Sequence, residues 1–299
     1  MFPVDVSLAR RLVDSQFPQW RDLPLRRLEP AGSDHVIYRL GPGLSARFPR
    51  HPGPIGQASK DLAWLPFLAP HLPLAVPTPV AVGRPDLGYP WPWGVSRWLP
   101  GSSAAGLGAS VGTARTLAEF LSTLQRLPVP SAAAALSGRP LAARDEVTRS
   151  AIADLAGVFD AAALTRVWQA ALDAPAWNRP PVWFHGDFHT GNLLAADGRL
   201  SAVIDFGGLG AGDPATDLQI AYTLLEPAPR AAFRAALDLD EATWARGRGW
   251  TLTGGLPAHR AYAAGDARIA EQTTRQITAA LADAAPAPGP ATGRPAGRL

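Results

Sequence analysis

The segment from Trp183 to Asp217 constrains the fold of this chain more than any other, because it sets three polar side chains at fixed offsets among apolar residues. Asp187 precedes Asn192 by five residues, and Asp205 follows Asn192 by thirteen. A Gly-punctuated loop surrounds the first two positions. The remainder of the chain can be interpreted as support for this segment.

Two short apolar runs, residues 193–195 and 200–206, indicate strands. The Asp197-Gly198 pair between them favours a tight hairpin turn, because both residues tolerate a positive φ. A hairpin folds back on itself, so Asn192 and Asp205 are expected at the same edge.

Asp187 lies in the loop that leads to this edge, so three oxygen-bearing side chains are expected to converge there. Proteins hold Mg²⁺ with a few carboxylate and amide oxygens and leave room for water and phosphate oxygens. The segment therefore predicts a site for magnesium and phosphate.

The same residues carry a resemblance to a known family. His185-Gly186-Asp187, with Asn192 five residues after the aspartate, follows the H-x-D-x-x-x-x-N pattern of the kinase catalytic loop, and Asp205-Phe206-Gly207 stands where kinases carry D-F-G. Through FHGDFHTGNLL and AVIDFGGLGAGDPATDL, the chain resembles the aminoglycoside phosphotransferase family, relatives of protein kinases that phosphorylate small-molecule hydroxyl groups.

This resemblance implies an α+β, protein-kinase-like bilobal fold. An N-terminal antiparallel sheet lobe with one helix would span residues 1–99, and a mainly helical C-terminal lobe carrying the catalytic hairpin would span residues 100–284. Residues 285–299 are rich in Pro, Gly and Ala and are expected to be a disordered tail.

The resemblance also implies roles in the catalytic segment. Asp187 would orient the acceptor hydroxyl and accept its proton, with His185 beside it in a largely structural role. Asn192 and Asp205 would hold Mg²⁺ on the phosphates of ATP or GTP.

Other interpretations of this segment stay open. Asp213 and Asp217 would brace the site in the resembling family, but Asp213 before Pro214 is also an ordinary turn and helix start. Alternatively, His185, Asp187 and His189 could form the site of a metal hydrolase, since imidazole and carboxylate groups suit zinc or iron.

Three further residues are assigned to the nucleotide by resemblance. Arg47 takes the place of the phosphate-pairing cation, Asp61 that of the acidic residue that pairs with it, and Ser33 lies in a loop that would cover the phosphates. A solvent-facing strand edge explains Arg47 otherwise, and a plain turn explains Ser33 nearly as well.

Residues 91–100 would form the last strand of the sheet lobe and the hinge, where Ser96 and Trp98 are candidate nucleotide contacts. The tryptophans here could instead be core residues, because tryptophan buries a large area. Backbone groups of the hinge would bind the base, so the side chains do not distinguish ATP from GTP.

Periodicity predicts the other elements. Helices are expected at 4–17, 57–68, 113–127, 142–158, 161–172, 214–226, 230–237, 240–250 and 266–283, and strands at 25–30, 35–40 and 44–48. Pro66 is expected to end or kink the second of these helices early, and the small residues of 101–112 to form a flexible linker.

The resemblance implies a small-molecule acceptor, and the charge of the last helices indicates which kind. Residues 226–284 contain seven acidic residues and seven arginines. A polycationic aminoglycoside should prefer an acidic wall. This balance favours a neutral or weakly charged acceptor such as a sugar derivative or macrolide, and an aminoglycoside acceptor stays open.

Composition excludes several other classes. The chain has 299 residues, no cysteine, 47% hydrophobic residues and a net charge of +3. Arginine supplies the basic charge apart from Lys60, without a basic cluster, so no nucleic-acid partner is expected. Neither an apolar run of about 18 residues nor a signal-peptide core occurs, so we expect no membrane association and a cytoplasmic location.

A nucleotide-binding pseudokinase with a regulatory role is the main alternative to an active kinase, because Arg47 and Asp61 depart from the usual Lys-Glu pair.

Overall fold

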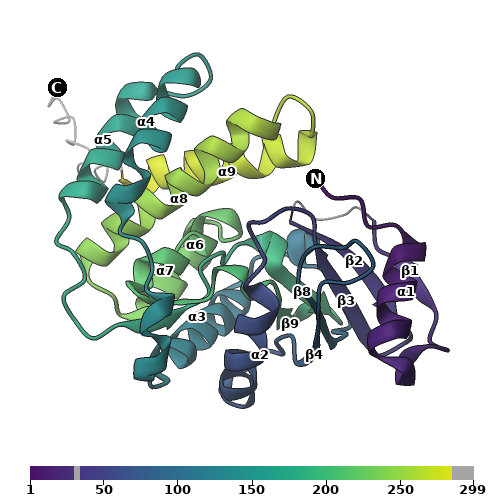
Figure 1. The fold of residues 1–299 in the computed structure, drawn as a ribbon. Helices are drawn as coiled ribbons and strands as arrows, with labels where there is room; N and C mark the ends of the chain where they lie inside the picture. The colour runs from purple at the N-terminus through teal and green to yellow at the C-terminus, as the bar shows by residue number, and fades with distance from the viewer. Residues whose placement is uncertain (30–33, 285–299) are drawn as a thin grey trace, which may run out of the picture.

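An antiparallel sheet of five strands forms the N-terminal part of the chain (Figure 1). The structure, a computed structural model, describes residues 1–29 and 34–284. The spatial order is β1 (Leu25–Arg27), β2 (His35–Leu40), β3 (Leu44–Pro49), β5 (Trp93–Arg97) and β4 (Pro79–Gly83). Ser33 and the proposed tail at 285–299 lie outside the described residues.

Side-chain alternation gives this sheet two different faces. On β3, Ala46 and Phe48 pack with α1 (Val6–Gln16) in one core, while Ser45 and Arg47 point to the opposite face. Phe48 stacks on Trp93 with ring centroids 4.6 Å apart. The face that carries Arg47 is therefore turned towards the second half of the molecule.

Helix α2 (Gln57–Leu68) connects the two halves. It packs against β4 and β5, yet its Leu65 and Leu68 belong to the larger core of the helical part. The expectation that Pro66 ends or kinks the helix early is wrong about its end, because α2 continues to Leu68. Pro66 lies in the last turn, where its missing N–H removes only one helical hydrogen bond.

Seven helices form most of the part described after Pro100. They are α3 (Val111–Arg126), α4 (Asp145–Asp154), α5 (Ala161–Asp173), α6 (Ile220–Thr223), α7 (Pro227–Leu237), α8 (Glu241–Tyr262) and α9 (Ala267–Ala284). Helix α3 packs on α7, and α8 packs on α5 and α9 (Figure 1). A sheet lobe beside a helical lobe confirms the α+β, kinase-like fold.

Three helices differ from the sequence-based prediction. The expected helix at 142–158 begins with a 3₁₀ turn (Leu141–Arg144), and its α-helical part is α4 alone. The expected helix at 214–226 is a 3₁₀ turn (Pro214–Asp217) followed by the short α6. Helix α8 extends beyond residue 250 through a Gly254-Gly255 pair. A Cβ at Gly255 would lie 3.2 Å from Gln276 of α9, so these glycines permit close helix packing rather than ending the helix.

The catalytic segment contains the predicted hairpin. Strand β8 (Leu193–Ala196) pairs antiparallel with β9 (Arg199–Val203), and Asp197 and Gly198 have φ values of 51° and 71° between them. Strand β7 (Val182–Phe184) pairs with β10 (Gly210–Gly212). The expected linker at 101–112 also contributes β6 (Ser102–Ser103), which pairs with β8. Across residues 1–29 and 34–284, no helix is both long enough and apolar enough to cross a membrane.

Candidate active site

His185 holds the loop after β7 from inside the core. Its side chain is fully buried, Nε2 lies 3.0 Å from the Ile204 carbonyl, and Nδ1 lies 3.2 Å from the Asp187 backbone N–H. Because the carbonyl can only accept and the N–H can only donate, the imidazole is neutral with its proton on Nε2. Burial lowers the pKa of His185 to about 4. Both ring nitrogens are engaged, so His185 cannot act as the metal ligand that a hydrolase site requires.

Asp217 binds the backbone of the same loop. Its two carboxylate oxygens accept hydrogen bonds from the backbone N–H groups of His185 (2.7 Å) and Gly186 (2.8 Å). Complete burial raises the pKa of Asp217 to about 7, although these hydrogen bonds oppose the shift. Gly186 has a φ of 85°, and a Cβ there would lie 2.0 Å from the Gly208 carbonyl oxygen, so the loop tolerates only glycine at this position.

Asp213 caps the 3₁₀ turn that begins at Pro214. It accepts from the Ala215 N–H and forms an ion pair with Arg246 at 2.6 Å. Asp213 therefore caps a turn, as one of the two interpretations of the sequence predicted. Asp217, in contrast, contacts the backbone of the loop after β7 directly.

Asp187 extends from this loop towards solvent, with about half of its side chain exposed. Its Oδ2 accepts from Asn192 Nδ2 at 3.0 Å and lies 3.5 Å from His189 Nε2. Partial burial alone would raise the pKa of Asp187, but the His189 and Asn192 hydrogen bonds and the charge of His189 lower it below its usual value. An accessible, ionised carboxylate is suited to receive a proton.

Asp205 is bound by two side chains from the sheet lobe and α2. Its Oδ1 accepts from Arg47 Nη2 at 2.9 Å and from Gln57 Nε2 at 3.0 Å. Burial opposes ionisation, yet the Arg47 charge and these hydrogen bonds hold the pKa of Asp205 well below its usual range. The backbone of Asp205 is left-handed, with a φ of 64°. Both recorded contacts use Oδ1, so Oδ2 can face a cation.

Asn192 is the second candidate oxygen ligand for a cation. Its Nδ2 donates to the backbone carbonyl and to Oδ2 of Asp187, and its backbone carbonyl accepts from the Ile204 N–H at 2.9 Å. Ile204 precedes Asp205, so the hairpin brings both candidate ligands to one edge. Two hard oxygens with room for water and phosphate fit Mg²⁺. In the part of the chain that the structure describes, no three His, Asp or Glu side chains gather as a metal site.

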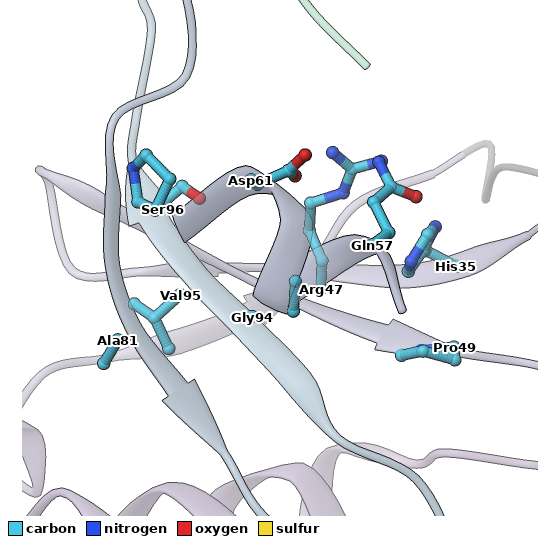
Figure 2. Close-up of a pocket in the computed structure, with 11 residues that line it drawn as sticks. His35, Arg47, Pro49, Gln57, Asp61, Ala81, Gly94, Val95 and Ser96 are labelled. Carbon is cyan, nitrogen blue, oxygen red and sulfur yellow. The ribbon is translucent and has the colours of Figure 1, made fainter. Parts of the chain in front are cut away.

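Arg47 and Asp61 do not form the direct pair that the family resemblance implies. The ion pair recorded for Arg47 is with Asp205, and Asp61 Oδ1 is buried without a hydrogen-bond partner in the described structure. Figure 2 shows both side chains beside a small pocket, together with Gln57 and Ser96. Burial raises the pKa of Asp61 to about 6, against the effects of Arg47 and Lys60.

A cleft of about 200 Å³ separates the sheet from the catalytic hairpin. Apolar side chains contribute from both sides, with Ile37 from the sheet and Leu194 from the hairpin. Ser96 and Trp98 line this cleft, and the Arg39 guanidinium lies 3.9 Å from the centre of a Trp98 ring. Arg47 and Asp205 add charged groups to this otherwise largely apolar lining. Trp93, by contrast, is a core residue.

A second cavity, of about 490 Å³, opens beside Asp187 between α8, α9 and the residue Gln219. Its lining is rich in uncharged polar groups, with Asp187 as the carboxylate. The lining residues are Asp187, His189, Gln219, Gly254, Ala258, Tyr262, Ile269, Gln272, Thr273 and Gln276.

Sequence reasoning did not identify two residues of α2 that contact the Asp205 segment. Gln57 binds Asp205, and Lys60 Nζ donates to the backbone carbonyls of Gly207 and Leu209. Neither has a motif of its own. The one available signal was that Lys60 is the only lysine in the chain.

The two lobes, with the cleft between them, have the fold of solved kinase-like structures. Residues 25–250 match the family APH, described as the phosphotransferase enzyme family, and the chain belongs to this family. It is therefore a nucleotide-dependent small-molecule kinase. A search of curated protein sequences finds no match.

Solved structures of this class share the fold. Wild-type aminoglycoside 2'-phosphotransferase-IIIa in complex with GDP superposes with a TM-score of 0.70 at 19% identity, covering 94% of this chain and 99% of that one. Macrolide 2'-phosphotransferase MphH from Brachybacterium faecium has a TM-score of 0.62 at 25% identity, covering 92% and 98%. ADP-bound aminoglycoside phosphotransferase APH(2'')-Ib has a TM-score of 0.60 at 16% identity, covering 92% and 98%.

Proposed function

We propose that this enzyme transfers the γ-phosphate of ATP or GTP to a hydroxyl group of a neutral or weakly charged small molecule in the cytoplasm, where both nucleotides are available. The cavity beside Asp187 carries this proposal. It is large enough for a sugar-like ring system, and amides and hydroxyls supply its polar groups.

In the proposed reaction, Asp187 is the base. The acceptor hydroxyl would bind in the cavity, donate its proton towards Asp187, and attack the γ-phosphorus as the bond to the diphosphate breaks. Arg47 would contact the phosphate oxygens, because a guanidinium binds them bidentately and keeps its charge.

Asn192 and Asp205 would hold Mg²⁺, and the ion would neutralise charge on the β- and γ-phosphates. The adenine or guanine ring of the nucleotide would lie between the sheet and the hairpin, near Ser96 and Trp98. Relatives of known structure hold GDP or ADP, so the donor could be either nucleotide type.

The charges of the helical lobe support a neutral acceptor. Five of the seven acidic residues in 226–284 are paired with arginines. The pairs are Glu226–Arg275, Asp240–Arg179, Glu241–Arg248, Asp266–Arg268 and Asp283–Arg248. The macrolide 2'-phosphotransferase among the similar structures is a precedent for such an acceptor in this fold.

Initial rates on a macrolide, a neutral sugar derivative and an aminoglycoside, each with ATP and with GTP, would test this proposal. We expect kcat/KM to be highest for a neutral or weakly charged acceptor. Equal or higher kcat/KM on the aminoglycoside would contradict the acceptor assignment. Nucleotide binding without turnover of any acceptor would favour the pseudokinase alternative.

A further inference from the structure

Gln219 is a buried residue whose side-chain amide is not used within the described chain. The residue is only 9% exposed, and its amide makes no hydrogen bond to any of the described residues. Its oxygen and nitrogen are also not among the side-chain atoms that the protein encloses without a partner, so the amide keeps some open surface. Because Gln219 lines the cavity beside Asp187, that surface faces the cavity. Buried polar groups are almost always hydrogen-bonded, so this amide needs a partner from the cavity side.

The position of Gln219 is fixed relative to Asp187. Asp217 binds the backbone of the loop that carries Asp187, and Gln219 is the N-cap of α6 two residues later. Both Gln219 and Asp187 line the same cavity of about 490 Å³. One ligand can therefore contact both side chains, with one group at Asp187 and another at Gln219.

Gly254 of α8 makes room for this amide. A Cβ at Gly254 would lie 3.0 Å from Gln219 Oε1 and 3.5 Å from Gln276 Nε2. Gln276 is 4% exposed, and its Nε2 donates to the Thr251 carbonyl at 2.7 Å. Two uncharged amides thus border the cavity at Gly254, where a side chain larger than hydrogen would crowd them.

The chemistry of the Gln219 amide selects the ligand. Its Oε1 accepts and its Nε2 donates, side by side on one planar group. Two neighbouring hydroxyl groups match this pair, since one can donate to Oε1 while the other accepts from Nε2. An ammonium group only donates and an ionised carboxylate only accepts, so either of them alone satisfies one end of the amide. Neighbouring hydroxyl groups are typical of a sugar ring.

We propose that Gln219 binds two neighbouring hydroxyl groups of the acceptor and is a specificity-determining residue for a sugar-like acceptor. Gly254 keeps the space in which the amide adopts this position. The inference rests on the proposed function, which puts the acceptor in the cavity beside Asp187. It narrows the acceptor from neutral or weakly charged small molecules in general to those that carry a vicinal diol.

Acceptor binding in the absence of nucleotide tests this assignment without any turnover. The probes are the methyl glycosides of glucose, galactose and mannose, titrated against the full chain by ligand-observed NMR. We expect at least one of them to bind the wild type. One of its monodeoxy analogues should bind about tenfold more weakly, the effect of leaving a buried polar group without its partner.

Gln219→Leu removes the amide. The intact glycoside should then bind about tenfold more weakly, and the deoxy analogue should show no further loss, because the group that recognised the missing hydroxyl is gone. The Tm should stay close to that of the wild type, since the amide makes no hydrogen bond among the described residues.

Gly254→Ala tests the same contact without a change at Gln219. The added Cβ should displace the amide, so glycoside affinity should fall several-fold. The Tm should stay the same or rise, because alanine favours a helix more than glycine does. Gly157→Ala, at an exposed glycine where a Cβ would meet nothing within 4 Å, is the matched control and should keep the wild-type affinity.

Wild-type glycoside affinity in Gln219→Leu would overturn the assignment, as would a wild type that binds none of the three glycosides. Unchanged affinity in Gly254→Ala would exclude the part assigned to Gly254. Glycoside binding that depends on Gln219 but leads to no phosphate transfer would contradict the proposed function alone. Phosphate transfer to a macrolide at the same rate in Gln219→Leu and wild type would support the proposed function and exclude the role of Gln219.

Discussion

Arg47 Nη2 lies 2.9 Å from Asp205 Oδ1, so the candidate phosphate ligand and the candidate metal ligand are paired with each other across the two lobes. The contact joins β3 to the end of the catalytic hairpin. It keeps Asp205 ionised in the absence of nucleotide, because the guanidinium charge opposes the effect of burial.

Gln57 is expected to position Asp205 for metal binding. In Gln57→Glu, a carboxylate would replace the amide that donates to Asp205 Oδ1 at 3.0 Å, and repulsion would turn Asp205 away. We expect the Mg²⁺ concentration for half-maximal nucleotide binding to rise about tenfold. This factor corresponds to the free energy of about one hydrogen bond to a charged group. Titration of nucleotide at several Mg²⁺ concentrations measures this.

Ser59→Ala, at an exposed position of the same helix, is the matched control and should behave as wild type. An unchanged Mg²⁺ requirement in Gln57→Glu would rule out the positioning role.

Asp187→Asn should lower kcat by about 10²–10⁴-fold, the range for loss of a general base. The nucleotide Kd should stay within about twofold, because the amide preserves the size of the side chain next to Asn192. Steady-state kinetics and titration calorimetry separate the two effects. Asp197→Asn, in the hairpin turn, is a control expected to retain activity, since asparagine also tolerates a positive φ. Full turnover in Asp187→Asn would exclude it as the base.

Asp205→Asn should abolish the dependence of nucleotide binding on Mg²⁺. Asparagine accepts the left-handed backbone at this position, so the variant removes the charge without straining the chain. Comparison with Asp205→Ala distinguishes loss of a metal ligand from strain. Mg²⁺-dependent binding that survives in both variants would mean that the metal is held elsewhere.

Acidification should destabilise the enzyme through His185. The folded pKa of about 4 lies below the unfolded value of 6.5, so the unfolded chain binds a proton first as the pH falls. The stability due to neutral His185 is complete above pH 6.5 and is lost towards pH 4. We therefore expect His185→Gln to have a lower Tm than wild type at pH 7 but a smaller further loss at pH 5.

Thermal melts across this pH range, with His71→Gln as the control at an exposed histidine, measure the difference. Parallel pH profiles for wild type and His185→Gln would contradict a neutral, buried His185.

Gln272→Glu should shift acceptor preference. Gln272 lines the cavity beside Asp187 and is only half-buried, so a carboxylate at this position adds negative charge without the cost of full burial. We expect KM for a polycationic aminoglycoside to fall several-fold, with more effect at low salt. The KM for a neutral acceptor should change little. The same change in KM for both acceptors would mean that the acceptor does not bind in the cavity beside Asp187.

Much of the fold followed from local patterns in the sequence. The Asp197-Gly198 turn and its two strands were predicted because the turn chemistry and the alternation are local. Helix α8 was predicted too short: it continues through Gly254 and Gly255, where the close packing on α9 depends on residues distant in the sequence. The expected flexible linker was likewise found to contribute β6, whose pairing with β8 depends on a segment about ninety residues away.

The sequence by itself determined which residues form the candidate catalytic segment, since the offsets between Asp187, Asn192 and Asp205 are fixed by a short loop and a hairpin. Only the tertiary structure decided the partners of these residues. Arg47 and Gln57 meet Asp205 because sheet twist and the packing of α2 set distances that no local pattern records. For the same reason, the sequence suggested a pair between Arg47 and Asp61, while the structure pairs Arg47 with Asp205 and leaves Asp61 Oδ1 without a hydrogen-bond partner among the described residues.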